Sequence, residues 1–596
     1  MSGRDNGRPE PENPTDPADP GNSADPGNSA DPGKSADRAD SAGPTDSAGP
    51  TDSADAARQP NGDGRAHHSA GGAGILGPFP TAADLGDLES VGGADTAADT
   101  ADAADDGGLD EGGADAADTG DSSWVIIPDA PPMDLPSVEA LLNARWPETK
   151  IEPSLERMTA LLDLLGNPQR AYPVIHVAGT NGKTSTARII DALLSSLGLR
   201  TGRFTSPHLQ LVTERISLDN APISPDAYVS AYTDIAPYVD MVDAASARDG
   251  GVPLSKFEVL TAMAFSAFAD APVDVAIVEV GLGGTWDSTN VVQPAVAVVT
   301  PIGMDHQDYL GETLAEVAEN KAGIIKPDTT AIIGPQPEAA LDVLMRRAVD
   351  VGAVVARYGS EFMVLQRDPA VGGQQLSLQG LSAEYDEIFL PLFGEHQAQN
   401  AATALAATEA FLGAGRSREL NAEAVRDGFA AVASPGRLER IRTSPTILID
   451  AAHNPDGAKA LAAAIADQYH FTRLVGVVAV MADKDADGIL TALVDTLDEV
   501  VVTVNSSPRS MPLDELTDIA AGIFGDHRVH PAPRMDEAIA MAVDIAETGG
   551  SAADTVTADP SDDNGAGDTP YGTGVLVTGS VVTAGDARTL AGLAPQ

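Results

Sequence analysis

Cysteine is absent from the 596-residue chain. Its absence excludes disulfide frameworks, thiolate metal sites and cysteine nucleophiles. Basic residues are scarce, because 36 Lys and Arg stand against 89 Asp and Glu, and the net charge of −53 disfavours binding to nucleic acid or anionic membranes. Apolar runs are short, the run at 474–482 falling well below the roughly 18 residues of a membrane span. The N-terminal segment also lacks the apolar core of a signal peptide, so a cytoplasmic protein is expected.

The N-terminal part is poor in residues that build a hydrophobic core. Residues 1–130 carry 27 acidic and 6 basic side chains, and their aromatic residues are Phe79 and Trp124. The segment is rich in Ala, Asp, Gly, Pro, Ser and Thr and contains direct repeats such as ADPGNS. It cannot bury enough apolar surface to offset chain entropy, so residues 1–130 are predicted to be a disordered acidic tail. A similar low-complexity patch predicts a disordered insertion at 549–570.

The rest of the chain alternates apolar runs of strand length with amphipathic stretches of helix length. Strands are predicted at 173–178, 273–280, 295–300 and 330–333, with helices such as 185–197 and 313–322 between them. The pattern restarts after residue 437, with strands at 446–450, 474–480, 499–504 and 575–579. Such alternation is typical of parallel sheets covered by helices. We therefore predict an α/β fold with two domains, 131–433 and 434–596.

The strongest chemical signal is a glycine-rich turn between a predicted strand and a predicted helix. It consists of Gly179, Thr180, Asn181, Gly182, Lys183 and Thr184. Glycines allow a tight turn around phosphate oxygens, and the helix N-terminus adds partial positive charge. Lys183 can bridge the β and γ phosphates and Thr184 can offer its hydroxyl to Mg²⁺. The turn is a shortened phosphate loop, since Val177 stands where the general pattern has Gly, and its context disfavours a chance match.

A carboxylate ends the apolar strand predicted at 273–280. Glu279 is followed closely by Gly281, Gly283 and Gly284. A buried carboxylate is costly unless it meets a cation or hydrogen-bond donors, and ligands collect at strand ends in open α/β sheets. We therefore expect Mg²⁺ at Glu279. The alternative is that Glu279 pairs with a buried Arg and stabilises the sheet.

Further motifs follow the phosphate loop. They are TSPHL at 205–209, ERI at 214–216, EVGLGGTWDSTN at 279–290, DH at 305–306, KAGI at 321–324, GEHQAQN at 394–400, PGRLE at 435–439, DAAHNP at 450–455, DKD at 483–485, SPR at 507–509 and TGS at 578–580. In this order they resemble the Mur ligase superfamily, and within it folylpolyglutamate synthase/dihydrofolate synthase, over roughly 138–596. The resemblance implies a P-loop ATPase domain followed by a smaller Rossmann-like domain.

The resemblance also implies an activity. It indicates an ATP-dependent ligase that adds L-glutamate to folates and to dihydropteroate through an acyl phosphate, releasing ADP and phosphate. ATP and two Mg²⁺ ions are the implied cofactors, the partners are small molecules, and a monomer is expected. Two alternatives are another Mur-type amino-acid ligase and an ATP-binding regulator that has lost turnover. The TSPHL loop argues against the first. The joint presence of Lys183, Ser206, Glu279, His306 and Lys321 argues against the second.

Roles for individual residues near the metals follow from the same resemblance. The implied metal ligands are Thr184, Ser206, Glu279 and His306. The implied catalytic residues are Lys183, Lys321, His306 and His453. Lys321 matches a lysine that the family carbamylates, which turns a cation into an acidic oxygen ligand. Taken alone, the residue types favour a structural histidine at His306 and, more strongly, a solvated surface lysine at Lys321.

Other residues resemble the family's substrate contacts. Asn400, Arg437 and Asp450 match ATP contacts from the hinge and the second domain, although Asp450 is also placed to cap a helix. The implied pterin contacts are Phe257, Glu258, Trp286 and Asp287. Four residues depart from the family pattern: Thr285 replaces Arg, Asn320 replaces Glu, Ser434 replaces Trp and Ala451 replaces Gly. Thr285 bears most on substrate preference because it lies beside the implied pterin contacts.

Overall fold

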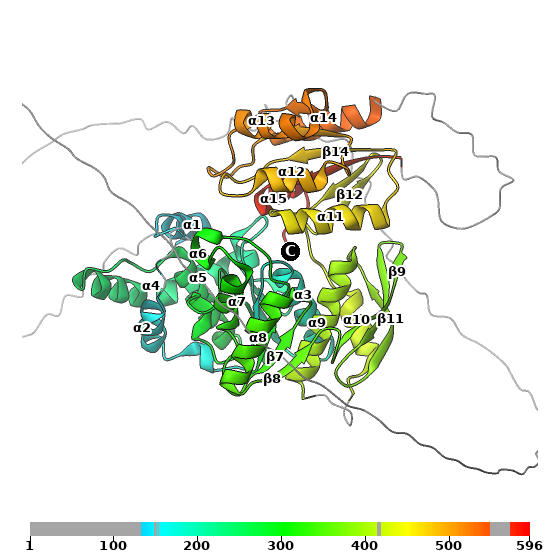
Figure 1. The fold of residues 1–596 in the computed structure, drawn as a ribbon. Coiled ribbons are helices and arrows are strands. Elements are labelled where there is room, and N and C mark those ends of the chain that lie inside the picture. Colours follow the sequence, from blue (N-terminus) through cyan, green and yellow to red (C-terminus); the bar gives the residue numbers. More distant parts are fainter. Residues whose placement is uncertain (1–132, 148–151, 153, 414–418, 549–571) are drawn as a thin grey trace, which may run out of the picture. The chain divides into compact units, whose positions relative to one another are not determined.

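The computed structural model describes residues 133–147, 152, 154–413, 419–548 and 572–596. The predicted disordered tail, 1–130, and the predicted disordered insertion, 549–570, lie outside the described residues. Figure 1 shows the helices and strands of the described residues, coloured along the sequence from blue to red. They form two mainly parallel sheets with helices on both faces, so the predicted α/β fold is confirmed.

The first sheet has eight strands in the order β4-β3-β2-β5-β1-β6-β7-β8. Its strands are β1 (Val174–Ala178), β2 (Thr201–Phe204), β3 (Ile216–Leu218), β4 (Ala221–Pro222), β5 (Val275–Glu279), β6 (Val296–Val299), β7 (Thr330–Ile333) and β8 (Val354–Arg357). All neighbours from β2 to β8 run parallel, and β3 and β4 add an antiparallel edge. The central strands are short apolar runs because both faces of the sheet are buried.

Helices cover both faces of this sheet. They are α1 (Leu135–Asn143), α2 (Glu156–Leu164), α3 (Lys183–Ser196), α4 (Pro225–Arg248), α5 (Lys256–Asp270), α6 (Gln307–Leu310), α7 (Leu314–Ala322), α8 (Glu338–Val351), α9 (Glu395–Phe411) and α10 (Ala422–Ala430). One hydrophobic core joins α3, α9 and α10 to one face, and two more cores pack α4 and α5, and α7 and α8, on the other. Four short 3-10 turns are η1 (Pro168–Arg170), η2 (Val212–Arg215), η3 (Ser288–Val291) and η4 (Asp526–Arg528).

An antiparallel sheet of three strands was not predicted from the sequence. It consists of β9 (Met363–Ala370), β10 (Gly373–Gln379) and β11 (Glu384–Leu390), in the order β11-β10-β9. Its outer strands carry many exposed polar residues, so they lack the apolar runs by which buried strands are recognised. The inward side chains of β10 and β11, such as Leu376 and Ile388, join the core of α9 and α10.

The second large sheet has six strands in the order β12-β13-β17-β14-β15-β16. The strands are β12 (Glu439–Thr443), β13 (Thr446–Ile449), β14 (Arg473–Val478), β15 (Glu499–Val502), β16 (Val529–Pro531) and β17 (Thr573–Thr578). The helices are α11 (Pro455–Gln468), α12 (Ala486–Leu493), α13 (Leu513–Phe524), α14 (Met535–Thr548) and α15 (Val581–Leu590). One face packs on α11, α12 and α13 and the other on α14 and α15. The four strands predicted here are all present.

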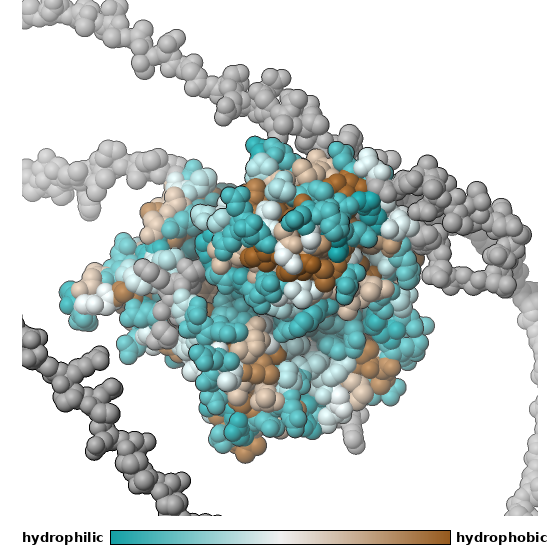
Figure 2. Space-filling model, turned by 45° about the horizontal axis from the view of Figure 1, so that its top comes forward, coloured by the Kyte–Doolittle hydropathy of each residue, from teal (hydrophilic) through white to brown (hydrophobic). Residues whose placement is uncertain are grey.

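The surface of the described part is largely polar. Figure 2 shows a face on which hydrophilic residues predominate and hydrophobic residues form small patches. Large hydrophobic side chains that remain exposed include Val349, Val354 and Val371. Among the described residues, no helix combines the length and apolar character needed to cross a membrane.

Candidate active site

The phosphate loop has the predicted local structure. β1 ends at Ala178 and α3 begins at Lys183, so the loop joins a buried strand directly to a helix N-terminus. Gly182 has φ 84°, and a Cβ there would lie 2.6 Å from Oδ1 of the buried Asn400. Glycine is therefore required by both conformation and space. The Lys183 ammonium group donates to the carbonyl oxygen of Thr180 at 3.1 Å, which folds the side chain back over the loop.

Thr184, Glu279 and Ser206 meet at the carboxyl ends of adjacent strands. Glu279 is 1% exposed at the end of β5, and β5 pairs with β1. Its carboxylate accepts hydrogen bonds from the Thr184 hydroxyl at 3.0 and 2.9 Å, and the backbone N–H of Ser206 helps to lower its pKa. Burial raises the pKa of Glu279, opposed by the charge of Lys183. A buried carboxylate with hydroxyl groups beside a phosphate loop is a set of hard oxygen donors that fits Mg²⁺.

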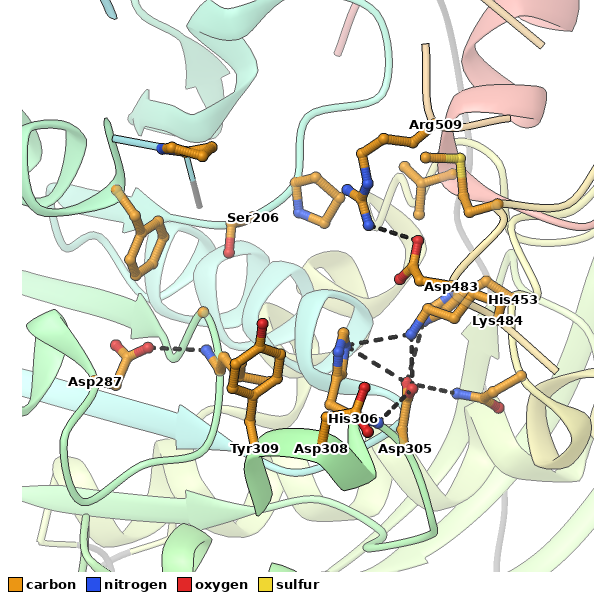
Figure 3. Close-up of a pocket in the computed structure, with 18 of the residues that line it drawn as sticks. Ser206, Asp287, Asp305, His306, Asp308, Tyr309, His453, Asp483, Lys484 and Arg509 are labelled. Atoms are coloured by element: carbon orange, nitrogen blue, oxygen red, sulfur yellow. Dashed lines mark hydrogen bonds and ion pairs between the residues drawn. The ribbon is translucent and has the colours of Figure 1, made fainter. Parts of the chain in front are cut away.

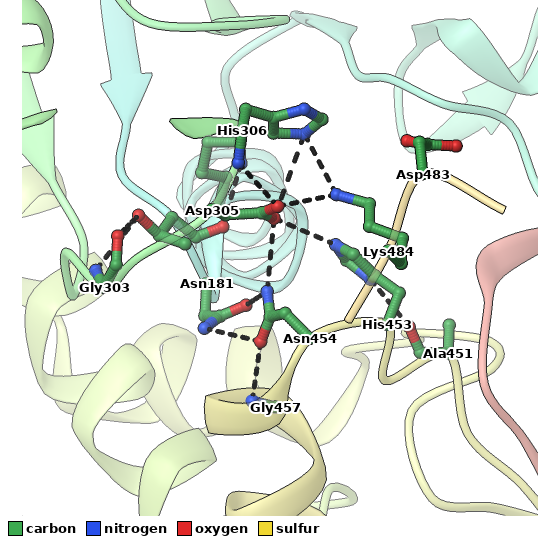
Figure 4. Close-up of polar contacts among 12 residues, drawn as sticks. Asn181, Gly303, Asp305, His306, Ala451, His453, Asn454, Gly457, Asp483 and Lys484 are labelled. Carbon is green, nitrogen blue, oxygen red and sulfur yellow. Dashed lines mark hydrogen bonds and ion pairs between the residues drawn. The ribbon is translucent and has the colours of Figure 1, made fainter. Parts of the chain in front are cut away.

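A cluster of polar residues connects the phosphate loop to the second large sheet. Figure 4 shows Lys484, His306, His453 and Asn454 around the carboxylate of Asp305. Lys484 Nζ lies 2.6 Å from Asp305 Oδ1, in a pair of which both side chains are 11% exposed. The Asn454 amide donates to Asn181 Oδ1 at 3.1 Å and to Asp305 Oδ2 at 3.3 Å. This cluster, which we call the Asp305 cluster, thus links the loops of Asp305, Asn454 and Lys484 to the phosphate loop through Asn181.

Electrostatics within the Asp305 cluster favour a charged aspartate and neutral histidines. Burial opposes ionisation of Asp305, but His306 and Lys484 outweigh it and hold its pKa below the usual range. Burial lowers the pKa of His306 and of His453 to about 4, so both imidazoles are neutral at pH 7. Lys484 Nζ lies 3.3 Å from His306 Nε2. A second Mg²⁺ on His306 does not fit this arrangement, because the ammonium group faces the same ring nitrogen.

Lys321 is buried rather than solvated. The side chain is 4% exposed in α7, and burial together with the charge of Lys183 lowers its pKa to about 7. The alternative that Lys321 is a solvated surface lysine is therefore wrong. A substantial fraction of the amine is neutral at physiological pH, which is the form that reacts as a nucleophile.

A cavity of about 1030 Å³ lies beside these groups. Figure 3 shows residues of both large sheets around it, with Ser206 and Asp287 across from Lys484 and Arg509. The predicted pterin contacts Phe257, Glu258, Trp286 and Asp287 all line it, as do His306 and His453. The structure thus brings the predicted pterin contacts, Ser206, His306 and residues of the second sheet together in one space, large enough for a drug-sized ligand. The other two predicted metal ligands, Thr184 and Glu279, are not among its lining residues.

Two predicted pterin contacts already have structural partners. Glu258 accepts from the Ser255 backbone N–H at 2.8 Å and from Arg157 Nε at 3.2 Å, completing a capping box at the start of α5. Asp287 is 3% exposed and accepts from the backbone N–H groups of Leu282 at 2.8 Å and Thr289 at 3.0 Å. These contacts fix both carboxylates, and their roles toward a pterin remain predictions.

The predicted ATP contacts occupy different surroundings. Asn400 is buried in α9 beneath Gly182, whereas Arg437 lies partly exposed after the hinge segment. Asp450 accepts from the backbone N–H of Leu438 at 2.7 Å and of Ala452 at 2.8 Å. Asp450 therefore braces its own loop, while the helix-capping role expected as the alternative belongs to Asn454, which accepts from Gly457 N–H at 2.8 Å. The proposed contacts of all three with ATP stay predictions.

The two departures nearest the pterin contacts touch each other. Thr285 donates through its backbone N–H and its hydroxyl to the carbonyl oxygen of Asn320, each at 2.9 Å. Ser434 meets Ser185 of α3 at 3.3 Å between hydroxyls, and the Ala451 N–H donates to Gly436 at 2.9 Å. The departures thus form local contacts of their own and leave the oxygen donors at Glu279 in place.

Several cavity residues received no role from the sequence. Lys484 and Arg509 belong to the DKD and SPR motifs and line the cavity, where Arg509 pairs with Asp483 at 2.6 Å. Trp146 and Arg157 come from the region around α1 and α2. The signal for Lys484 was available, since lysine is rare in this chain and the motif follows a predicted strand. No sequence pattern singled out Trp146.

Comparisons with known proteins show the family to which the chain belongs. The Mur ligase middle domain matches residues 256–408, and the Mur ligase glutamate ligase domain matches 436–560. The dihydrofolate synthase/folylpolyglutamate synthase of Mycobacterium tuberculosis is 55% identical over 488 residues, covering 80% of this chain and 98% of that relative.

Solved structures give the same result. Mycobacterium tuberculosis folylpolyglutamate synthase in complex with ADP is 54% identical and has a TM-score of 0.72, with 78% of this chain and 99% of that one covered. Escherichia coli FolC in complex with DHPP and ADP is 29% identical with a TM-score of 0.64, covering 77% and 97%. The fold and the site thus define an ATP-dependent amino-acid ligase of the Mur type. Within that class, the chain belongs to the dihydrofolate synthase/folylpolyglutamate synthase family.

Proposed function

We propose that this enzyme joins L-glutamate to tetrahydrofolate and its polyglutamates, and also to dihydropteroate. The observation that carries the proposal is a cavity whose lining includes Ser206, the aromatic residues Phe257 and Trp286, and Lys484 and Arg509 from loops of the second large sheet. Aromatic and cationic side chains in one cavity suit a pterin ring and an amino acid with two carboxylates, and Ser206 belongs to the same group of residues as Thr184 and Glu279 beside the phosphate loop.

The chemistry follows from the poor reactivity of a carboxylate. An oxygen of the folate carboxylate attacks the γ phosphorus of ATP, the bond to the β–γ bridging oxygen breaks, and ADP leaves. The glutamate amine then attacks the acyl carbon, phosphate departs, and the amine loses a proton. Mg²⁺ held by Thr184, Ser206 and Glu279 would supply positive charge at the phosphates when bound. Lys183 provides a fixed cation in the same place, where charge builds up during phosphoryl transfer.

The buried environment limits competition from water. Asp305 and Lys484 come from loops of different sheets, and their contact holds these loops together at the cavity that both residues line. A closed cavity strengthens electrostatic interactions and protects an acyl phosphate from hydrolysis. His306 and His453 line this part of the cavity, and their lowered pKa values keep both imidazoles neutral there at pH 7. A second Mg²⁺ beside His306 would require the Lys484 ammonium group to withdraw.

Carbamylation of Lys321 belongs to the same proposal. The reaction joins CO₂ to a neutral amine with loss of one proton, and the lowered pKa of Lys321, about 7, makes that form accessible. In the unmodified protein the positive charge of Lys183 disfavours a positive charge on Lys321. The carbamate instead carries a negative charge near Lys183. Carbamylation therefore replaces a like-charge repulsion by an attraction.

An ADP-release assay tests the proposal and its alternatives. Dihydropteroate, tetrahydrofolate and a peptidoglycan precursor are each supplied with ATP and the matching amino acid, and products are identified by mass spectrometry. Glutamylated folate and dihydrofolate are expected. Turnover with the peptidoglycan precursor alone would instead identify another Mur-type ligase, and ATP binding without any turnover would identify a regulator.

A monomer and a cytoplasmic location stay predictions, checked by analytical ultracentrifugation and cell fractionation.

A further inference from the structure

The loop after Ser206 is seated on the last helix of the second sheet. We call Pro207 to Leu211 the docking loop, and it faces α15. A Cβ on Gly585 of α15 would lie 1.9 Å from the carbonyl oxygen of Leu209, where ordinary contact begins at 3.4 Å. The obstacle is backbone, which cannot rotate away. Glycine at this helical position therefore permits a close approach that any other residue would prevent.

Side chains of the docking loop strengthen the contact. Gln210 uses both ends of its amide: Oε1 accepts from Arg588 Nε at 2.9 Å, and Nε2 donates to the Leu593 carbonyl at 3.0 Å and to the Thr589 hydroxyl at 3.3 Å. Arg588 is 1% exposed and also pairs with Glu439 of β12. A buried charge with fixed partners holds the Gln210 amide in one orientation.

Leu209 adds an apolar contact. Its side chain packs against the core that Ala584 and Ala587 of α15 form with the second sheet. The docking loop belongs to the first sheet by connectivity, yet it contributes a side chain to the core of the second. The contact thus combines close backbone approach, hydrogen bonds and apolar burial, which together specify one position of the loop.

The backbone of the docking loop is held by Glu214 of η2. Glu214 is 3% exposed and accepts the backbone N–H groups of Leu209 at 2.8 Å, Gln210 at 3.1 Å and Leu211 at 3.1 Å. The loop is therefore a braced unit and not a flexible connection. Ser206 precedes the loop directly, and its backbone N–H is one of the groups that lower the pKa of Glu279. A displacement of the loop is transmitted to Ser206 and Glu279.

We infer that Gly585 and Gln210 are positioning residues: seating of the docking loop on α15 places Ser206 beside Glu279 and Thr184. The phosphate and metal end of the site is complete only when α15 is in contact with the loop. The inference rests on the proposed function for its kinetic readout, and on the geometry alone for its structural one. This positioning role explains why α15, which does not belong to the phosphate loop, has a glycine in close contact with the Leu209 carbonyl oxygen.

Gly585→Ala tests the inference directly, with Gly522→Ala as the matched control. Gly522 lies in α13, and a Cβ there meets no atom within 4 Å. Gly585→Ala is expected to lower kcat about tenfold or more, since small displacements of reacting groups cost large factors in rate. It should also raise the Mg²⁺ concentration for half-maximal turnover, while KM for the folate stays within about twofold. Gly522→Ala should change none of these quantities.

Hydrogen exchange of the Leu209, Gln210 and Leu211 amides supplies a readout besides activity. Gly585→Ala should accelerate their exchange relative to wild type, and Gly522→Ala should not. A lower melting temperature with unchanged exchange and unchanged Mg²⁺ dependence would overturn the inference, because α15 would then be only a structural contact. Wild-type protein that releases no ADP would refute the proposed function instead and leave the exchange result valid.

Gln210→Ala serves as the second variant in case Gly585→Ala does not fold. It introduces no overlap and removes only the three amide contacts to α15 and the segment after it. The same acceleration of amide exchange and the same rise in Mg²⁺ requirement are expected, in smaller degree, and Gln210→Glu should not restore them because its carboxylate cannot donate to Leu593. Wild-type Mg²⁺ dependence and exchange in Gln210→Ala would overturn the inference.

Discussion

The hydroxyl of Thr184 donates to both carboxylate oxygens of Glu279, at 3.0 and 2.9 Å. The contact joins the first turn of α3 to the end of β5. Helix α3 follows β1, and β1 is the neighbour of β5 in the first sheet. Lys183 and Arg437 are the positive charges that act on Glu279. Burial still raises the pKa of Glu279, so these charges offset the cost of burying the carboxylate only in part, and a divalent cation would relieve the rest.

Glu279→Gln should raise the Mg²⁺ concentration needed for half-maximal turnover and lower kcat, while metal-free ADP binding changes little. Gln keeps the shape and removes the charge, so the loss falls on metal affinity. The melting temperature should stay close to wild type, because the buried charge that burial penalises is gone. A Mg²⁺ titration of turnover and a melting curve on the same preparation check this. A large loss of stability with unchanged Mg²⁺ dependence would support a purely structural Glu279.

Lys183→Ala should reduce turnover about 100-fold or more, by loss of a fixed cation at the transferring phosphoryl group. The protein should fold normally, because the ammonium group of Lys183 donates to Thr180 of its own loop and not to the core. Steady-state ADP release and circular dichroism measure the two effects. Lys459→Ala, at an exposed position of α11, is the control. Turnover of Lys183→Ala within about threefold of wild type would remove Lys183 from the mechanism.

Local chemistry made much of the fold predictable. Strands such as β1 and β5 read as apolar runs because both faces are buried, and the glycine-rich turn marked the junction of β1 and α3. The sheet of β9, β10 and β11 was missed because its outer strands are largely exposed and polar. Ser255 and Glu258 carry the Ser-x-x-Glu pattern of a capping box, a signal that would have predicted the start of α5.

Long-range contacts explain what the sequence could not provide. Lys484 and Asp305 are 179 residues apart, and their pairing depends on how two sheets lie against each other. The burial of Lys321 was accessible in principle, since Lys321 lies four residues after Val317 and therefore on the same apolar face of α7. No local sequence pattern predicts the contact between the docking loop and Gly585. A glycine in a helix ordinarily only weakens the helix.

Carbamylation of Lys321 should be visible without any assay of activity. Protein equilibrated with carbon-13 bicarbonate is expected to show a bound carbonyl signal that Lys321→Arg lacks. The signal should grow as the pH rises through about 7, because the neutral amine is the reactive form and its population rises through that pKa. The exposed Lys459 remains in both proteins and controls for non-specific carbamates. Equal signals in wild type and variant would contradict carbamylation at this lysine.

Lys484→Met should weaken the contact between the two large sheets and reduce turnover about tenfold or more, because it leaves Asp305 buried without its cation. Lys484 Nζ lies 2.6 Å from Asp305 Oδ1 with both side chains 11% exposed. Lys459→Met should have little effect, because the ion pair that it removes, with Asp456, is exposed: the side chains are 67% and 52% accessible. Turnover and small-angle scattering of both variants check the loss of the contact. Wild-type turnover in Lys484→Met would show that the Asp305 cluster does not hold the site together.

The same variant has a distinct pH signature. Asp305 has a pKa below its unfolded value of 3.8, so its ionisation stabilises the folded protein above pH 3.8. That contribution is lost as the pH falls through the lower folded value. Without Lys484 the pKa of Asp305 should rise toward or above 3.8, since burial alone raises it. Between pH 4 and about pH 2 the free energy of unfolding should therefore fall less steeply in Lys484→Met than in wild type. Chemical denaturation at a series of pH values measures both slopes, and equal slopes would show that Lys484 does not set the ionisation of Asp305.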